Sequence, residues 1–384
     1  MADYSNLEPF LKLLADKEGS DLYFSTGTMP AMKIQGEMRF IGREPLQPGQ
    51  TRTLAASMLS AEQMAHFDKT LELNAALQLS GVGRYRLNAF MQRGELAMVI
   101  RFIKSDIPGI EQLNLPKILH QLILEKRGLI IVVGATGSGK STTLASMIDY
   151  RAQQIPGHIL TIEDPIEFAF QHRNSVVNQR EVGVDTHNYA AALKEAMREA
   201  PDVIMIGEVR DRANMEHALA YADTGHLCLT TLHATNAHQA LDRIMRFFPP
   251  EGRDQLLMDL SLNLKAVISQ RLIISSDGRR MPAVEVLINS PFISELIRRG
   301  NVDQINDAME KSAQGGMQTF DMSLFQLWKD EKITREEALT NADSRANLEW
   351  RMNFGSSMKG SNPDAEPQNA PPGQNESGDL PPLG

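Results

Sequence analysis

The pattern of apolar and polar positions divides the chain into two parts. Apolar residues at helical spacing from Leu7 to Leu14 predict a first helix, and short apolar runs broken by Gly and Pro in residues 19–41 predict β-strands. A second helical stretch covers roughly Pro48 to Lys69, and alternation over residues 84–103 predicts an antiparallel hairpin. We therefore expect a small α+β domain over residues 1–103.

The pattern changes after a polar stretch that contains Pro, residues 104–117, which is typical of a linker. A helix is expected from Ile118 to Glu125. Continuous apolar strands then alternate with helical segments, and the expected strands cover residues 129–133, 158–162, 203–206 and 226–230. Strands that are apolar on both faces indicate a parallel sheet covered by helices on both sides. We expect an α/β doubly wound domain over residues 118–355, with helices dominating beyond Pro291.

The last segment, residues 356–384, has a different composition. Its 29 residues include six Pro and four Gly but no aromatic or β-branched residue, so it buries too little apolar surface to order itself. We predict a disordered tail. A solvated extension is favoured over a tether that docks a partner.

Composition limits the classes of function. The hydrophobic content of 42% and charged content of 23% are those of a globular protein, and no apolar run approaches the ~18 residues of a membrane span. The N-terminus lacks the features of a secretory signal, so a cytoplasmic location is expected. The net charge of −9 disfavours a nucleic-acid groove. Cys228 is the one cysteine, which excludes an intrachain disulfide and leaves too few thiolates for structural zinc.

A phosphate-binding motif follows the first strand of the α/β part. Residues 134–141 are GATGSGKS, which fits G-x-x-x-x-G-K-[ST] between a strand and a helix-prone segment. The backbone would cradle ATP phosphates, Lys140 would add positive charge, and the Ser141 hydroxyl would bind Mg²⁺. The expected nucleotide-binding residues are Gly134, Thr136, Gly137, Ser138, Gly139, Lys140, Ser141 and Thr142.

Three carboxylates follow the next strand in the sequence TIEDPIE. The strand would carry Glu163 to the sheet edge where a triphosphate lies, and there Glu163 could act as the general base for water. Asp164 and Glu167 could hold metal-bound waters or a neighbouring cation. The alternative is a charged surface loop closed by Pro165.

Glu208 comes just after the expected strand 203–206, in the position of a Walker B acid that binds or orients Mg²⁺ and its waters. The common pattern has Asp there. His226 and His233 lie at strand ends, and His233 could hydrogen-bond a γ-phosphate or serve only as a packing residue.

Arg84, Arg86 and Arg101 lie on the predicted hairpin of the first domain. Arg84 and Arg86 are two residues apart and therefore share one strand face. If this face packs onto a nucleotide of the same chain or of an adjacent subunit, the guanidinium groups would neutralise charge on the γ-phosphoryl group. Otherwise they form an exposed polar face.

Four blocks occur together in one order: the P-loop, TIEDPIEF, APDVIMIGEVRD and TGHLCLTTLHATNAHQALDRI. In this combination the chain resembles the secretion and type IV pilus ATPase superfamily, where such blocks are the Walker A, Asp, Walker B and His boxes. SPFISELIRRGN and GGMQTFDMSLFQLW resemble motifs of the retraction branch, so the similarity is to the PilT/PilU family, on its PilU side. It extends from about Leu7 to Gly355.

This resemblance implies a PAS-like N-terminal domain, a RecA-like ATPase domain and a homohexamer with ATP between subunits. It also implies a catalytic base at Glu163, a Walker B acid at Glu208, a His-box residue at His233 and arginines that act in trans. Assembly-type relatives often carry a four-cysteine zinc module, which this chain cannot form.

The implied function is ATP-driven pilus retraction, with an inner-membrane pilus platform protein and a second PilT-type ATPase as candidate partners. One alternative is an accessory subunit that binds nucleotide and assists a partner motor with little turnover of its own. Another is a RecA-like nucleic-acid motor, which the acidic charge balance disfavours.

Overall fold

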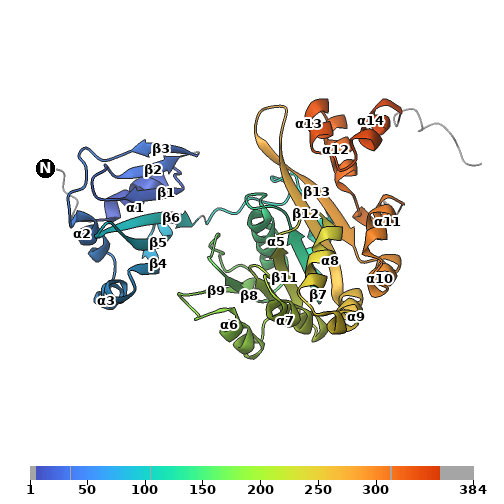
Figure 1. Ribbon diagram of the computed structural model, residues 1–384, viewed down its shortest axis with the longest axis horizontal. Helices are drawn as coiled ribbons and strands as arrows, with labels where there is room; N and C mark the ends of the chain where they lie inside the picture. The colour runs from blue at the N-terminus through green and yellow to red at the C-terminus, as the bar shows by residue number, and fades with distance from the viewer. Residues whose placement is uncertain (1–5, 35, 104, 312–313, 355–384) are drawn as a thin grey trace, which may run out of the picture.

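The structure is a computed structural model that describes residues 6–34, 36–103, 105–311 and 314–354. The expected tail, residues 356–384, lies outside these residues. Figure 1 shows a smaller N-terminal part and a larger C-terminal part that an extended segment joins. Within the described ranges, no helix has the length and apolar character needed to cross a membrane.

The N-terminal part is an antiparallel sheet with helices packed on it. The strand order is β3-β2-β1-β6-β5-β4. Its elements are α1 (Glu8–Asp16), β1 (Asp21–Phe24), β2 (Ala31–Ile34), β3 (Glu37–Phe40), α2 (Gln50–Ala56), α3 (Ala61–Thr70), β4 (Glu72–Leu79), β5 (Gly83–Gln92) and β6 (Glu95–Ile103).

The single helical stretch expected near residues 48–69 is in fact two helices, because Ser60 begins α3 with a capping box. The Ser60 hydroxyl accepts a hydrogen bond from the Gln63 backbone N–H at 3.1 Å, and the Gln63 side chain accepts one from the Ser60 N–H at 2.9 Å. Strand β4 was not expected from the pattern.

The side chains of β5 alternate between the two faces of this sheet. Tyr85, Leu87 and Ala89 are buried in the core, and the Tyr85 hydroxyl donates to the Leu11 carbonyl of α1 at 2.7 Å. Since side chains alternate along a strand, Arg84 and Arg86 lie on the opposite face, as their spacing predicted. This face points away from the N-terminal core.

The segment between the two parts is only partly free. Ile110 and Leu115 are buried in the same apolar cluster as Met147 and Ile148 of the C-terminal part. His120 also approaches Glu111 at 2.8 Å between Nε2 and Oε1. The expected linker of residues 104–117 therefore packs on the C-terminal part over its second half. The division of the chain into domains stays a proposal.

The C-terminal part is a seven-stranded sheet in the order β13-β12-β7-β11-β10-β8-β9. All neighbouring strands are parallel except β12 and β13. Its strands are β7 (Gly128–Val133), β8 (Gly157–Glu163), β9 (Ser175–Glu181), β10 (Val203–Ile206), β11 (Leu227–Leu232), β12 (Leu264–Ile274) and β13 (Arg280–Ile288).

Helices cover both faces of this sheet (Figure 1). Alternate residues of β7 enter different clusters: Ile131 packs with residues of α6 to α11, and Ile130 packs with residues of α4 and α5. The helices are α4 (Ile118–Ile123), α5 (Lys140–Gln154), α6 (Tyr189–Ala196), α7 (Arg212–Asp223), α8 (Ala237–Arg246), α9 (Arg253–Asn263), α10 (Pro291–Arg298), α11 (Ile305–Lys311), α12 (Phe320–Lys329), α13 (Arg335–Thr340) and α14 (Arg345–Phe354).

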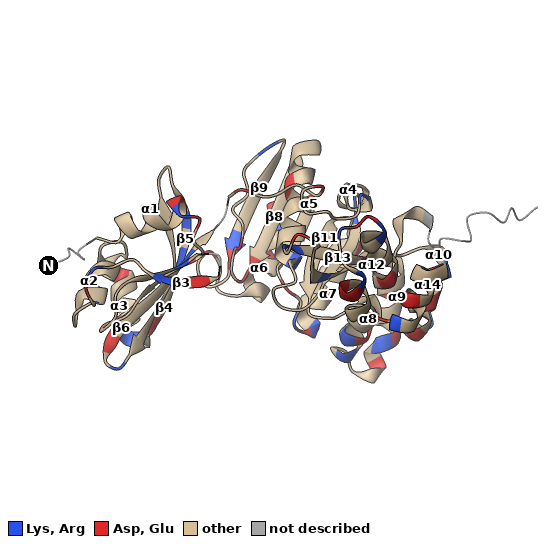
Figure 2. Cartoon of the chain, turned by 90° about the horizontal axis from the view of Figure 1, so that it is seen from above, with Lys and Arg blue, Asp and Glu red and all other residues tan. Residues whose placement is uncertain are grey.

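The last three helices pack on the β12–β13 ribbon through a separate cluster that includes Ile273, Phe320 and Leu348. Neither strand of this ribbon was expected from the sequence pattern. Figure 2 shows that basic and acidic residues are interspersed along both parts of the molecule.

Candidate functional site

A cavity of about 440 Å³ lies at the carboxyl ends of β8, β10 and β11, next to the start of α5. Ligands of open α/β sheets bind at this edge of the strands. The candidate residues that line it come from the P-loop (Thr136, Gly137, Gly139, Lys140, Ser141, Thr142), from the end of β8 and the following loop (Glu163, Asp164, Glu167) and from the segments after β10 and β11 (Glu208, His233).

The P-loop takes a conformation that needs glycine. Gly137 and Gly139 have φ values of 77° and 90°, which residues with a side chain rarely adopt. Lys140 begins α5, and its Nζ donates to the carbonyls of Gly134 and Ala135 at 2.9 and 3.0 Å. Burial lowers the pKa of Lys140. The ammonium group thus closes the loop on itself and borders the cavity.

Gln270 of β12 holds this loop, and the sequence pattern missed it. Its Oε1 accepts from the Thr143 hydroxyl at 2.6 Å. A Cβ at Gly139 would lie 2.7 Å from the Gln270 Nε2, and one at Gly134 would lie 2.6 Å from its backbone oxygen. The first and third glycines of the motif therefore allow β12 to approach. Without an expected strand at residues 264–274, no signal pointed to Gln270.

Two of the expected nucleotide-binding residues support the loop and do not line the cavity. Gly134 lies behind it, against Ser138 and Gln270. Ser138 is buried, and its hydroxyl has no hydrogen-bond partner among the described residues.

Glu163 occupies the last position of β8 with only 7% of its surface exposed. One carboxylate oxygen accepts hydrogen bonds from the Thr161 hydroxyl at 2.7 Å and from the Gln179 amide at 3.1 Å. Burial raises the pKa of Glu163 to about 7, although both hydrogen bonds oppose the rise. A carboxyl group with such a pKa can accept a proton near neutral pH. The contribution of Gln179 was not foreseen.

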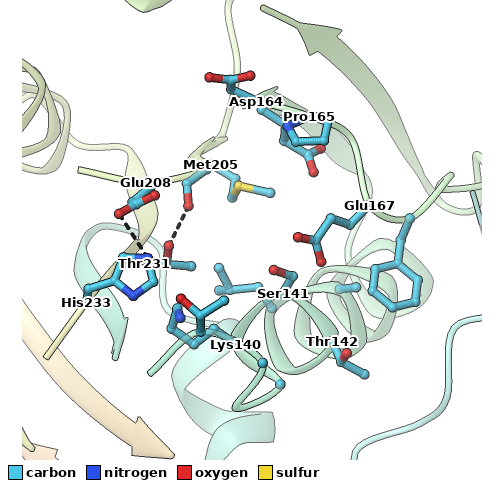
Figure 3. Close-up of a pocket in the computed structure, with 18 of the residues that line it drawn as sticks. Lys140, Ser141, Thr142, Asp164, Pro165, Glu167, Met205, Glu208, Thr231 and His233 are labelled. Atoms are coloured by element: carbon cyan, nitrogen blue, oxygen red, sulfur yellow. Dashed lines mark hydrogen bonds and ion pairs between the residues drawn. The ribbon is translucent and has the colours of Figure 1, made fainter. Parts of the chain in front are cut away.

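Glu208 and His233 lie next to each other on one side of the cavity (Figure 3), 3.3 Å apart between Oε1 and Nε2. The other Glu208 oxygen binds the Arg210 guanidinium at 2.8 Å. The Thr231 hydroxyl donates to the Gly207 carbonyl at 2.7 Å and so links the ends of β11 and β10. His226 precedes β11 and therefore lies at the opposite sheet edge.

The donor atoms suit Mg²⁺. Ser141 supplies a hydroxyl oxygen and Glu208 a carboxylate oxygen to the same cavity, and Mg²⁺ prefers oxygen ligands. Two protein oxygens leave most of an octahedral shell for phosphate oxygens and water. Ser141 and Glu208 therefore fit a bound Mg²⁺ ion.

None of the three arginines lines this cavity. Arg84 Nη2 lies 3.7 Å from Asp185 Oδ2, and the Arg101 Nε donates to Asp21 Oδ1 at 2.8 Å. Arg86 lines a separate cavity of about 630 Å³ between the two parts, and Asp164 lies in the walls of both cavities.

Comparison with known proteins agrees with this geometry. The family described as Type II/IV secretion system protein matches residues 87–350. The chain is 49% identical to the Type IV pilus ATPase PilU of Pseudomonas aeruginosa, over 91% of this chain and 92% of that protein. It is 40% identical to the Type IV pilus retractation ATPase PilT of the same species, over 88% and 98%.

The crystal structure of the pilus retraction motor PilT with bound ADP superimposes with a TM-score of 0.81 at 40% identity, covering 88% of this chain and 98% of that one. The structure of the ATPase DotB of Legionella pneumophila matches with a TM-score of 0.71 at 26% identity, and the match covers 86% of this chain and 94% of DotB.

Fold and cavity define a P-loop ATPase of the secretion type. The chain belongs to the Type II/IV secretion system protein family, in its group of PilT/PilU-type pilus ATPases. The resemblance inferred from the four sequence blocks and the α/β fold class are thus confirmed, and so is the assignment as an ATPase. The roles of the individual site residues stay predictions.

Proposed function

We propose that the chain is a Mg²⁺-dependent ATPase motor that powers type IV pilus retraction as a homohexameric ring. It would act at the cytoplasmic face of the inner membrane on a pilus platform protein, with or without a second PilT-type ATPase. The names of its relatives, pilus retraction motors among them, support this proposal.

The residues would divide the hydrolysis of ATP among them. The P-loop N–H groups and Lys140 bind the phosphates, after Lys140 exchanges its two carbonyl partners for phosphate oxygens. Glu163 takes a proton from the attacking water, and His233 contacts the terminal phosphate. Ser141 and Glu208 would hold Mg²⁺, partly through bound water. The ion would neutralise charge that develops on the phosphate oxygens.

The observation that carries the ring proposal is the position of the arginines. The cavity of one chain holds the lysine and the acids but none of Arg84, Arg86 and Arg101. In phosphoryl transfer an arginine stabilises charge on the γ-phosphoryl group in addition to the lysine and Mg²⁺, and it accelerates the reaction strongly. An adjacent subunit is a source for it, and closing a ring gives each cavity one such neighbour.

The test in the host compares deletion of the gene with the Lys140→Ala allele, with fibre retraction scored under load. A motor requires that both abolish retraction to the same extent. A mild allele beside a severe deletion would favour the accessory subunit, because presence would then matter more than turnover.

The purified chain gives a second test. ATP turnover should exceed that of Glu163→Gln by at least about 100-fold, the usual contribution of a general base. Equal rates would contradict the motor, and turnover stimulated by DNA in a salt-sensitive manner would favour a nucleic-acid motor.

A further inference from the structure

Tyr189, the first residue of α6, contributes to the cavity wall beside the two key acids. Its ring packs against the core of the C-terminal part. Its hydroxyl points to the ends of β8 and β10: a Cβ added at Gly207 would lie 3.0 Å from this oxygen and 3.3 Å from the Cα of Glu163. Gly207 thus leaves space for the Tyr189 hydroxyl near the backbone of Glu163, and both residues line the same cavity.

The Tyr189 hydroxyl also differs from those of the two buried core tyrosines, Tyr85 and Tyr221. Tyr85 and Tyr221 donate their hydroxyls to the backbone carbonyls of Leu11 and Leu193. Within the part of the chain that the structure describes, the Tyr189 hydroxyl makes no hydrogen bond. A donor left free at the wall of a reaction cavity is available to a ligand or to water.

Burial and the nearby carboxylates keep this hydroxyl protonated. Burial raises the pKa of Tyr189, and the carboxylates of Asp164, Glu163 and Glu208 raise it further, against Arg210. At neutral pH the group therefore stays protonated and can donate a hydrogen bond, and it does not serve as a base.

We propose that Tyr189 is a catalytic residue whose hydroxyl holds the attacking water for Glu163. The water accepts a hydrogen bond from Tyr189 with one lone pair and donates one proton to Glu163. Its other lone pair then forms the bond to the terminal phosphorus, while the bond from that phosphorus to the ADP oxygen breaks. The proton passes to Glu163, and Tyr189 keeps its own.

The test is Tyr189→Phe, which keeps the ring in the core and removes only the donor. We expect kcat to fall by about five- to tenfold, the loss of one neutral hydrogen bond in the transition state, with KM within about twofold of the parent. Affinity for ADP with Mg²⁺ and aluminium fluoride, which mimics the transition state, should fall by a similar factor. Affinity for ADP alone should not change.

Tyr221→Phe is the matched control, since it loses a hydroxyl contact to the Leu193 carbonyl in the same core but away from the cavity. It should lower Tm and leave kcat unchanged. The proposal is overturned if Tyr189→Phe keeps kcat within about twofold, raises KM alone, or merely reproduces the effect of Tyr221→Phe.

This inference rests on ATP hydrolysis and not on the coupling to a pilus. If the purified parent chain shows no turnover, the proposed motor fails, while the two nucleotide affinities still test Tyr189. Equal losses of affinity for ADP alone and for ADP with aluminium fluoride would then count against it.

Discussion

At the scale of single residues, burial gives the two key glutamates different chemistry. Glu163 is almost fully buried with two neutral donors on one oxygen, and its pKa rises to about 7. Glu208 instead has the cationic Arg210 on one oxygen and His233 near the other. Glu163 can therefore gain and lose a proton near neutrality, whereas the Glu208 carboxylate borders the same cavity as the Ser141 hydroxyl, as a metal ligand would.

The pH profile of kcat should follow Glu163. Because its pKa of about 7 lies above its usual value, Glu163 is protonated below that pH and cannot accept a proton from water. We expect kcat to fall by about tenfold per pH unit below about pH 6 and to level off above about pH 8. Steady-state kinetics between pH 5 and 9 measure this fall of kcat, the acid limb of the pH profile.

Thr161 offers a matched variant, since its hydroxyl donates a hydrogen bond to Glu163 and makes no other among the described residues. Thr161→Val keeps the shape of the side chain and removes the donor that lowers the pKa of Glu163. The acid limb should therefore move to higher pH. A limb that stays in place, or one that survives in Glu163→Gln, would assign it to another group.

At the scale of elements, a buried carboxyl group joins three of them. Glu285 of β13 accepts hydrogen bonds at 2.8 Å from the Ser269 hydroxyl of β12 and from the Ala237 N–H at the start of α8. Ser269 is paired with Val133, the last residue before the P-loop, and α8 begins shortly after His233. The carboxyl group thus connects the strand beside the P-loop with the segment that carries the histidine.

Burial raises the pKa of Glu285 to about 7, from an ordinary value of 4.5. The folded chain then binds this proton more tightly than the unfolded chain does. The free energy of unfolding therefore falls as pH rises from 4.5 to about 7, by about 3 kcal/mol in total. Glu285→Gln should remove this part of the pH dependence, as measured by urea unfolding at pH 5 and pH 8.

Glu295 on α10 provides the control. The guanidinium groups of Arg298 and Arg299 hold its pKa near 2, so its charge does not change between pH 5 and pH 8. Glu295→Gln should leave the pH dependence of stability unchanged in that range. If Glu285→Gln also leaves the pH dependence of stability unchanged, Glu285 is ionised in the folded chain over the whole range from pH 5 to pH 8.

At the scale of the whole molecule, the proposed site is incomplete in one chain. Arg86 lies in the cavity between the two parts, and Arg84 and Arg101 have acidic partners outside the nucleotide cavity. Completing the site within one chain would require the N-terminal part to move. Completing it with a neighbour requires only that two chains pack together, which is the basis of the proposed ring.

Mixing two inactive variants separates these possibilities. Arg86→Ala should bind nucleotide but not hydrolyse it, because a finger acts on charge that forms during the reaction. If Arg86 acts in trans, a mixture with Glu163→Gln contains sites with Glu163 from one chain and Arg86 from the next. About one quarter of the sites in a random equal mixture should then be active.

Wild-type chains mixed with themselves set the full rate for this experiment, and each variant alone sets the background. A mixture that stays at background would place Arg86 and Glu163 of the same chain in one site. Loss of nucleotide binding in Arg86→Ala would contradict the role of a finger altogether.

Much of the site could be predicted from the sequence because its residues lie at the ends of strands with a strong apolar pattern. The order of the strands delivers Glu163, Glu208 and the P-loop to one sheet edge, so local pattern and topology suffice. Gln270 and Glu285 could not be found in this way. They lie on β12 and β13, which were not among the expected strands, and they act across 127 and 48 residues of sequence, on Thr143 and Ala237.

The sequence by itself determined the α/β class, the nucleotide-binding loop and the family, because these depend on short segments whose spacing is imposed by the backbone and by phosphate. Only the tertiary structure decided which protons are held, which hydroxyl is free and where the arginines lie. Burial sets the pKa of Glu163, the absence of a side chain at Gly207 leaves room for the Tyr189 hydroxyl at the cavity wall, and the arrangement of the two parts keeps Arg86 outside the cavity. Such properties arise from contacts between distant residues, and no local pattern encodes them.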